Sequence, residues 1–227
     1  MKRYYPWLMA LLGMTVLLVS NGLVVTGLTV FDESLLKEFG WSRGQLKLRD
    51  LITLVLAGWM APFLGVVIDR MGPRKLILAG LALLAVLYAA YSQVHSLKHI
   101  YLIHVGFAAV LVAAGLNVVV IFVSQWFRTN RGTAIGIALV GTSLSGVFMP
   151  QIVLALIGTH GWRESFLWLA IIPVVMLVLV MLVVRAPRAD GPQPLGAGDA
   201  GSGGGDAQQV ASTAQSDIGY AEALRTR

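Results

Sequence analysis

The chain has 227 residues, of which 57% are hydrophobic and only 12% are charged. A typical soluble domain is about 45–50% apolar and about 25% charged, so a soluble fold of this length could not bury its apolar surface, and much of the chain must lie in lipid. The formal net charge is +6, but the basic residues stand singly between apolar runs. This pattern indicates short basic loops between membrane spans and argues against a nucleic-acid partner.

Six apolar segments are long enough to cross a bilayer, which requires about 20 mostly apolar residues for a hydrocarbon core about 30 Å thick. The first is too long for the hydrophobic region of a cleaved signal peptide, so it is predicted to be retained. Helices are expected, because backbone exposed to lipid must satisfy its own hydrogen bonds. The predicted spans are Tyr5–Phe31, Gln45–Ile68, Leu76–Gln93, Ile100–Trp126, Gly132–Ile157 and Phe166–Val184.

Basic residues near the span ends predict the orientation of the chain. With a cytoplasmic amino terminus, nine lysines and arginines flank the inner ends of the spans. Only four flank the outer ends, or six if Lys47 and Arg49 are included. Both termini are therefore expected in the cytoplasm, with the lipid bilayer of the cell's inner or plasma membrane around the spans.

The composition changes after residue 185. Residues 186–227 are rich in glycine, proline and alanine and cannot bury a core, which predicts a flexible cytoplasmic linker or tail. A linker normally joins two parts, and no further apolar span follows this one. The predicted fold class is therefore all-α: an integral membrane six-helix bundle over residues 1–185, followed by a disordered tail.

The loop between the second and third spans carries the most specific pattern in the chain. It contains Gly65 one helical turn before Asp69, where a missing side chain lets another helix pack closely. A carboxylate at the membrane interface is costly unless it is paired. Gly72 permits a tight reversal of the chain. The basic residues that could pair with the carboxylate, or that only set the topology, are Arg70, Arg74 and Lys75.

This loop resembles the G-x-x-x-D-R-x-G-x-R-[KR] signature of the major facilitator superfamily, and all six signature positions match. The segment Gly161–Phe166 resembles the G-W-R-x-x-F pattern of the same superfamily. Trp126–Gly136 is similar to the W-F-x-x-x-R-G-x-A-x-G pattern of its monocarboxylate and oxalate/formate transporter branch. The resemblance covers residues 5–190, the first six spans of a twelve-span fold.

The resemblance implies half of a twelve-helix transporter, built from two three-helix inverted repeats at about 1–95 and 96–185. It also implies that the signature residues latch the cytoplasmic side to the opposite half in the outward-facing state. Two features depart from the family. The arginine that many proton-coupled members carry early in the fourth helix is absent, and the first span lacks the lysine of monocarboxylate carriers. Proton coupling and substrate charge therefore stay open.

Polar residues inside the spans are candidates for a substrate pathway, because each costs free energy in lipid. Asn21, near the middle of the first span, and Asn117 in the fourth either face a midplane cavity or form an interhelical hydrogen bond. In the fifth span, Thr142 either lines the pathway or bonds back to its own helix. The glycines of that span are expected to allow close packing rather than to bind a ligand.

Arg49 and Asp50 are the most sharply placed charges. The 18 apolar residues Leu51–Ile68 already span about 27 Å, so both charges are predicted at the outer end of the second span. They form either an interfacial ion pair or an outer gate that handles protons.

No enzyme is expected, because the chain has no phosphate loop, Ser/His/Asp arrangement or paired carboxylates. No cofactor or metal is expected either. The predicted function is secondary active transport of a small solute, a small organic anion, with a proton or counter-anion as the coupled ion. Alternating access would require a second six-helix half, which is missing from a truncated chain, separate, or supplied by self-pairing. The alternative is a non-transporting membrane scaffold or regulator; a channel ranks lower, because no selectivity filter is present.

Overall fold

The structure, a computed structural model, describes residues 4–184, and this part of the chain forms helices without strands. The predicted tail at 186–227 lies outside the described residues. A π-helical turn at Gly22–Gly27 follows the first helix, and a 3-10 turn at Ala61–Phe63 precedes the fifth. The helices are α1 (Tyr5–Asn21), α2 (Leu28–Val30), α3 (Asp32–Phe39), α4 (Arg43–Met60), α5 (Leu64–Met71), α6 (Pro73–Tyr91), α7 (Leu97–Ala114), α8 (Leu116–Ser124) and α9 (Arg131–Val183).

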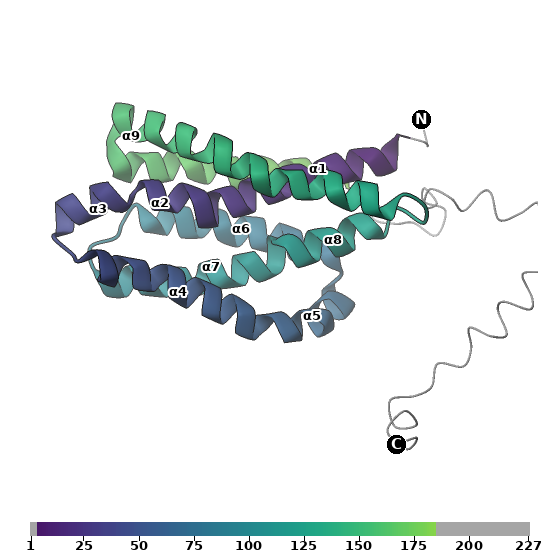
Figure 1. Ribbon diagram of the computed structural model, residues 1–227, viewed down its shortest axis with the longest axis horizontal. Coiled ribbons are helices and arrows are strands. Elements are labelled where there is room, and N and C mark those ends of the chain that lie inside the picture. The colour runs from purple at the N-terminus through teal and green to yellow at the C-terminus, as the bar shows by residue number, and fades with distance from the viewer. Residues whose placement is uncertain (1–3, 185–227) are drawn as a thin grey trace, which may run out of the picture.

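Five continuous helical stretches are long and apolar enough to cross a membrane, and the last of them contains two spans. This stretch, α9, has 53 residues. A straight helix of that length would extend about 80 Å, far beyond a core of about 30 Å. Gly161 interrupts it with φ 76° and ψ 170°, and Figure 1 shows its two parts side by side. The predicted six apolar helices and the all-α class are therefore confirmed.

The connections between spans gather at two ends of the bundle (Figure 1). One end, called the α3 end here, carries α3, the connection between α6 and α7, and the bend in α9. The other, called the Tyr5 end, carries the reversal at Gly72 and the start of α9. There the Tyr5 hydroxyl donates a 2.8 Å hydrogen bond to the Val183 carbonyl, so the two edges of the described chain meet.

Close backbone contact holds α1 against the first part of α9. A Cβ atom at Gly141 would overlap the carbonyl oxygen of Met14, so only glycine allows this approach. Gly136 and Gly146 have open space where a Cβ would stand. The close packing expected of these glycines is therefore present at Gly141 and absent, within residues 4–184, at the other two.

The short helix α3 was not predicted from the sequence. Asp32 and Glu33 occupy its first turn and Lys37 its last, an arrangement that suits the helix dipole, and Gly40 ends it at φ 66°. The next helix, α4, begins with a capping box. The Ser42 hydroxyl accepts the Gln45 backbone N–H at 3.2 Å, and the Gln45 side chain accepts that of Ser42 at 3.0 Å.

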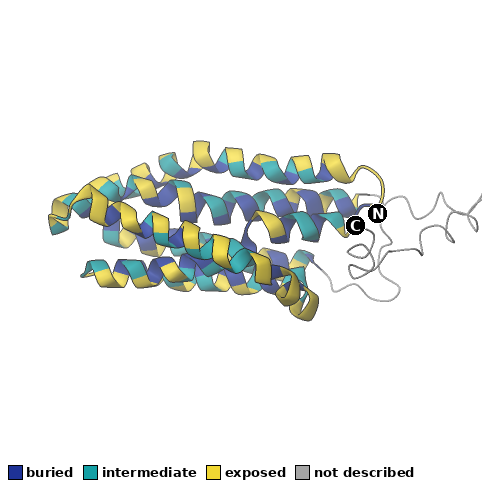
Figure 2. Ribbon diagram, turned by 60° about the horizontal axis from the view of Figure 1, so that its bottom comes forward, coloured by how far each residue is buried: buried dark blue, intermediate teal, exposed yellow. Residues whose placement is uncertain are grey.

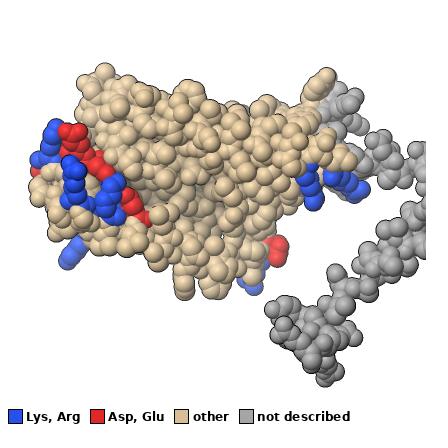
Figure 3. Space-filling model, in the orientation of Figure 1, with Lys and Arg blue, Asp and Glu red and all other residues tan. Residues whose placement is uncertain are grey.

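Charged residues gather at the two ends of the bundle, and buried residues lie between its helices. Figure 3 shows the charged side chains at both ends, with an uncharged belt between them. Figure 2 shows buried residues between the helices and exposed ones on the outward faces. The second span is the least covered, with 17% of its apolar window buried against 61% for the first. The uncharged belt is the surface expected of a protein that crosses lipid.

A valine at Gly141 is expected to destabilise the bundle, because its side chain would push α1 from α9. Overpacking of this kind costs about 1–3 kcal/mol or more. The measurement is the free energy of unfolding in mixed micelles. Gly136→Val is the matched control and should stay near the wild type, since its site is open. Equal losses from the two variants would contradict this account of the packing.

Candidate functional site

Arg49 lies inside the helix bundle, with no exposed surface. A guanidinium without partners there would cost several kcal/mol. Its Nη1 donates to the Tyr91 hydroxyl at 2.9 Å and its Nη2 to the Leu28 carbonyl at 3.2 Å. Nη2 also pairs with Asp32, and Nε bonds Asp50 Oδ1 at 3.3 Å. The structure thus places Arg49 near the end of the second span, as predicted, but inside the protein rather than at its surface.

Two cations and two carboxylates form a closed set of ion pairs, called the charge ring here. Arg49 pairs with both Asp32 and Asp50. Lys47 Nζ also pairs with both, at 2.7 Å from Asp32 Oδ2 and 3.1 Å from Asp50 Oδ2. The ring carries no net charge, which reduces the cost of placing it beside lipid. It joins α3 to α4 and runs from the half-exposed Lys47 to the fully buried Arg49.

A polar contact continues from the ring toward the interior. Thr53, one turn after Arg49, has its hydroxyl 2.8 Å from Nδ1 of His104 on α7. His104 is buried, and its Nε2 has no hydrogen-bond partner among residues 4–184. Beyond it lies an aromatic layer in which Tyr91 stacks on Phe166 with ring centroids 4.5 Å apart. The charge ring therefore lies between the outside of the bundle and an apolar floor.

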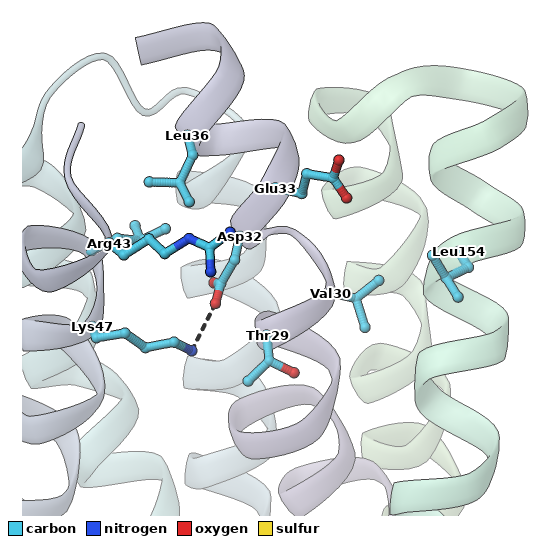
Figure 4. A pocket seen from close by; sticks show the side chains of 9 residues that line it. Thr29, Val30, Asp32, Glu33, Leu36, Arg43, Lys47 and Leu154 are labelled. Carbon is cyan, nitrogen blue, oxygen red and sulfur yellow. Dashed lines mark ion pairs between the residues drawn. The ribbon is translucent and has the colours of Figure 1, made fainter. Parts of the chain in front are cut away.

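A cavity of about 490 Å³ opens beside the ring at the α3 end (Figure 4). Asp32 and Lys47, the two outer members of the ring, line it, and their ion pair is drawn there. Arg43 extends into it from α4, and Leu154 of α9 faces them from the opposite wall. A charged network and an open cavity thus share one wall.

The signature loop lies at the Tyr5 end, in a different part of the bundle. Gly72 has φ 77°, as the tight reversal requires, and Pro73 begins α6. Asp69 is exposed and forms no ion pair within the described range. Apart from its chain neighbours and the backbone of its own helix, no described atom lies within 4 Å of where a Cβ of Gly65 would stand. Arg74 instead reaches the Met181 carbonyl at 3.2 Å; Arg70 and Lys75 are exposed.

The Gly161–Trp162–Arg163 segment closes the α3 end. Gly161 has φ 76°, which suits glycine and turns the chain between the two parts of α9. The Trp162 indole donates to Glu38 of α3, and Arg163 Nη2 pairs with Glu38 at 2.9 Å. Arg163 Nη1 also donates to the carbonyls of Ser92 and Val94, at 3.1 and 3.2 Å. One segment thus joins α3, the α6–α7 connection and α9.

Comparison with known proteins identifies the family. Residues 7–223 match the family described as Major Facilitator Superfamily. The chain belongs to this superfamily. The segment Gly65–Lys75 lies within the matched range, and the six apolar helices are those of an all-α half of the superfamily's fold.

Curated relatives in the superfamily include several transporters. The chain is 29% identical to the fujikurins efflux protein of Gibberella fujikuroi over 61% of its length and 30% of the relative's. It is 21% identical to the oxalate:formate antiporter of Oxalobacter formigenes over 82% of its length and 44% of the relative's. It is 28% identical to human monocarboxylate transporter 14 over 72% of its length and 32% of the relative's. The chain thus spans less than half the length of these relatives.

The polar residues predicted to line a pathway lie in different surroundings. Asn21 is half-buried at the end of α1, directly before the π-helical turn, and its side chain makes no hydrogen bond within residues 4–184. Asn117 is exposed, two residues after the break in the fourth span at Gly115. The Thr142 hydroxyl donates to the Leu139 carbonyl of its own helix at 2.7 Å. The side chains of Asn21 and Asn117 are therefore available to a ligand, whereas the Thr142 hydroxyl is bonded back to its own helix.

Sequence reasoning missed the partners of Arg49. Nothing in the sequence linked Asp32, Tyr91 or Thr53 to this site. These residues stand 17, 42 and 4 positions from Arg49, and only the last interval is a helical spacing. The one available signal was the free energy cost of placing the Arg49 charge in a membrane span, which requires a carboxylate nearby.

Arg49→Gln is expected to destabilise the protein by about 3–5 kcal/mol, because it leaves Asp32 and Asp50 without their buried partner. The matched control is Lys47→Gln, whose half-exposed ion pairs should cost no more than about 1 kcal/mol. Both are measured as free energies of unfolding in mixed micelles. The double variant Arg49→Gln/Asp32→Asn should recover part of the loss. A double variant no more stable than Arg49→Gln alone would contradict the ring as the cause.

The α3 end is expected to weaken in acid. The hydrogen bond from Trp162, with the nearby Arg163 guanidinium, holds the pKa of the Glu38 carboxyl below its usual 4.5. A lowered pKa means that this contact stabilises the fold above about pH 4.5 and is lost as the pH falls through the lowered value. Thermal unfolding of the wild type and Glu38→Gln from pH 7 to pH 3 measures it. The two should differ at neutral pH and converge in acid; a constant difference would refute the assignment.

Proposed function

We propose that this chain forms one half of a secondary active transporter that moves a small organic anion by alternating access. The observation that carries the proposal is the uncovered surface at the signature loop. Gly65 has open space beside it, and Asp69 is exposed and lacks an ion pair within residues 4–184. A motif matched at all six positions, with its first glycine uncovered and its carboxylate unpaired within residues 4–184, is what half of a two-part machine would present.

The second span supports the same proposal, because a row of large apolar side chains on it has no cover from the rest of the described chain. In the complete machine, part of this face contacts the second half and the remainder contacts lipid. Gly65 lies on the same helical stretch, where its missing side chain would admit a second helix. The exposed side chains are Leu51, Leu54, Val55, Trp59, Phe63 and Val66.

Charge at the two ends of the bundle supports an inward-facing Tyr5 end. Counted along the sequence, nine lysines and arginines flank the span ends that meet here, against six at the α3 end when Lys47 and Arg49 are included. The positive-inside rule then puts the Tyr5 end, and with it both termini, on the cytoplasmic side. Asp69, Arg70 and Arg74 would hold that side closed during part of the cycle, while the half bundles rock around a midplane site.

The substrate class rests on the relatives. Two of them are named as a monocarboxylate transporter and an oxalate:formate antiporter, and all three of those anions are small carboxylates. A proton or a counter-anion is the proposed coupled ion. The second half would come from a longer reading frame, a separate chain or a second copy, and reading the gene past the codon for Arg227 separates the first from the others.

The functional test is uptake of labelled lactate and of labelled oxalate into liposomes. The protein is the 227-residue chain together with its second half, from whichever of these three sources supplies it. Asp69→Asn should lower uptake about tenfold or more, as expected for loss of a charge that acts in the closed state. Glu164→Gln, which removes an acid at the α3 end, is the matched control and should transport normally.

The alternative, a membrane scaffold or regulator that does not transport, makes the opposite prediction. A well-folded assembly containing both halves, or a stable self-pair, would show no uptake of either anion above empty liposomes. Uptake that Asp69→Asn leaves unchanged would contradict the gating role while keeping transport.

A further inference from the structure

We propose that the cavity at the α3 end binds a monocarboxylate with an apolar body, and that Arg43 is its principal ligand. This inference rests on the proposed transport of organic anions and places an outer binding site on this half of the machine. The cavity has a volume of about 490 Å³, enough for a carboxylate with a short hydrocarbon chain.

The ligand's charge is set by which side chains in the cavity are already paired. Lys47 is held by both carboxylates of the charge ring. Glu33 pairs with Lys37 at 2.8 Å. Arg43 also lines the cavity but forms no ion pair with any residue from 4 to 184; it acts on Glu33 only through space. Arg43 is thus the charge available to a ligand, and its planar guanidinium matches a carboxylate with two parallel hydrogen bonds.

The two cationic residues of the cavity share one face of α4. Arg43 and Lys47 are separated by four residues, one helical turn, and Figure 4 shows both reaching into the cavity from the same side. A carboxylate bound by Arg43 would therefore lie close to Lys47, at the outer edge of the charge ring. Its occupancy would compete with Asp32 for Lys47, which connects binding in the cavity to the pairing of Arg49.

The rest of the lining favours a single charge and an apolar body. Val30, Leu36, Leu46 and Leu154 supply hydrocarbon walls. Asp32 and Glu33 are the cavity's acids, and they would repel a second negative charge on the ligand. The site should therefore prefer a monocarboxylate to a dicarboxylate of the same length.

The test is a ligand-observed NMR titration of the full 227-residue chain in lipid nanodiscs, with empty nanodiscs as the blank. Hexanoate and adipate are the probes, because both have six carbons and they differ in one carboxylate. Hexanoate should bind saturably and about fivefold more tightly than adipate, the factor that corresponds to one exposed charge pair. Arg43→Gln should weaken hexanoate about fivefold.

Three further variants separate a site from general electrostatic attraction. Glu33→Gln should tighten hexanoate binding about twofold, because it removes a repelling charge. Lys98→Gln removes one positive charge at the same end but outside the cavity lining, so it should change nothing. Leu154→Trp narrows the cavity from the wall that faces Arg43, without changing charge, and should weaken hexanoate binding, which keeps the test valid if Arg43→Gln folds poorly. Helical content by circular dichroism checks each variant.

Several results would overturn the proposal: no saturable binding by the wild type, adipate binding as tightly as hexanoate, or equal losses from Arg43→Gln and Lys98→Gln. Hexanoate binding by Leu154→Trp as tight as that of the wild type would overturn it as well. None of these depends on uptake. If hexanoate fails to bind while Asp69-dependent uptake persists, only this site is wrong. If hexanoate binds and no uptake occurs, the site stands and the transport proposal fails.

Discussion

The arrangement of the α3 end depends on one constraint, the guanidinium of Arg49 inside a bundle that faces lipid. A charge that cannot reach water must be paired and hydrogen-bonded within the protein. The capping box at Ser42 sets where α4 begins and so sets the depth of Arg49, about 9 Å along the helix from Arg43. The fold then brings Asp32 on α3, Tyr91 on α6 and the Leu28 carbonyl to meet it.

The two ends of the bundle are built in opposite ways. At the α3 end, most charges are satisfied within the chain, by the charge ring and by the contacts of Arg163 with Glu38, whereas Arg43 beside the cavity forms no ion pair within residues 4–184. At the Tyr5 end, the signature loop presents Asp69 without an ion pair in the described part of the chain. Ion pairs closed mostly within the chain at one end and an uncovered loop at the other suit a body that moves as one unit and exchanges its contacts at the Tyr5 end. That division favours a transporter half over a scaffold, which has no need for a latch.

The proposed carboxylate cavity would add a ligand-binding site to the α3 end. It shares Lys47 and Asp32 with the charge ring, so a ligand there would act on the same ion pairs that hold α3 to α4. A substrate bound by Arg43 would then compete for the ion pair between Lys47 and Asp32 before it reaches any midplane site. Asn21 and Asn117, whose side chains make no hydrogen bond within residues 4–184, stay candidates for that deeper site.

The sequence by itself determined the features that depend on local composition and spacing. Apolar runs of sufficient length predicted six spans, and the signature loop predicted the superfamily and the reversal at Gly72. It could not reveal α3, a short polar helix whose formation depends on Leu35 being buried by the bundle. Nor could it reveal which carboxylate neutralises Arg49 or that Arg43 is left unpaired beside a cavity. Those facts depend on side chains from different helices, and only the packing of the helices brings them together. The length of an apolar segment can be counted along the sequence, whereas an ion pair depends on the distance between two side chains in space.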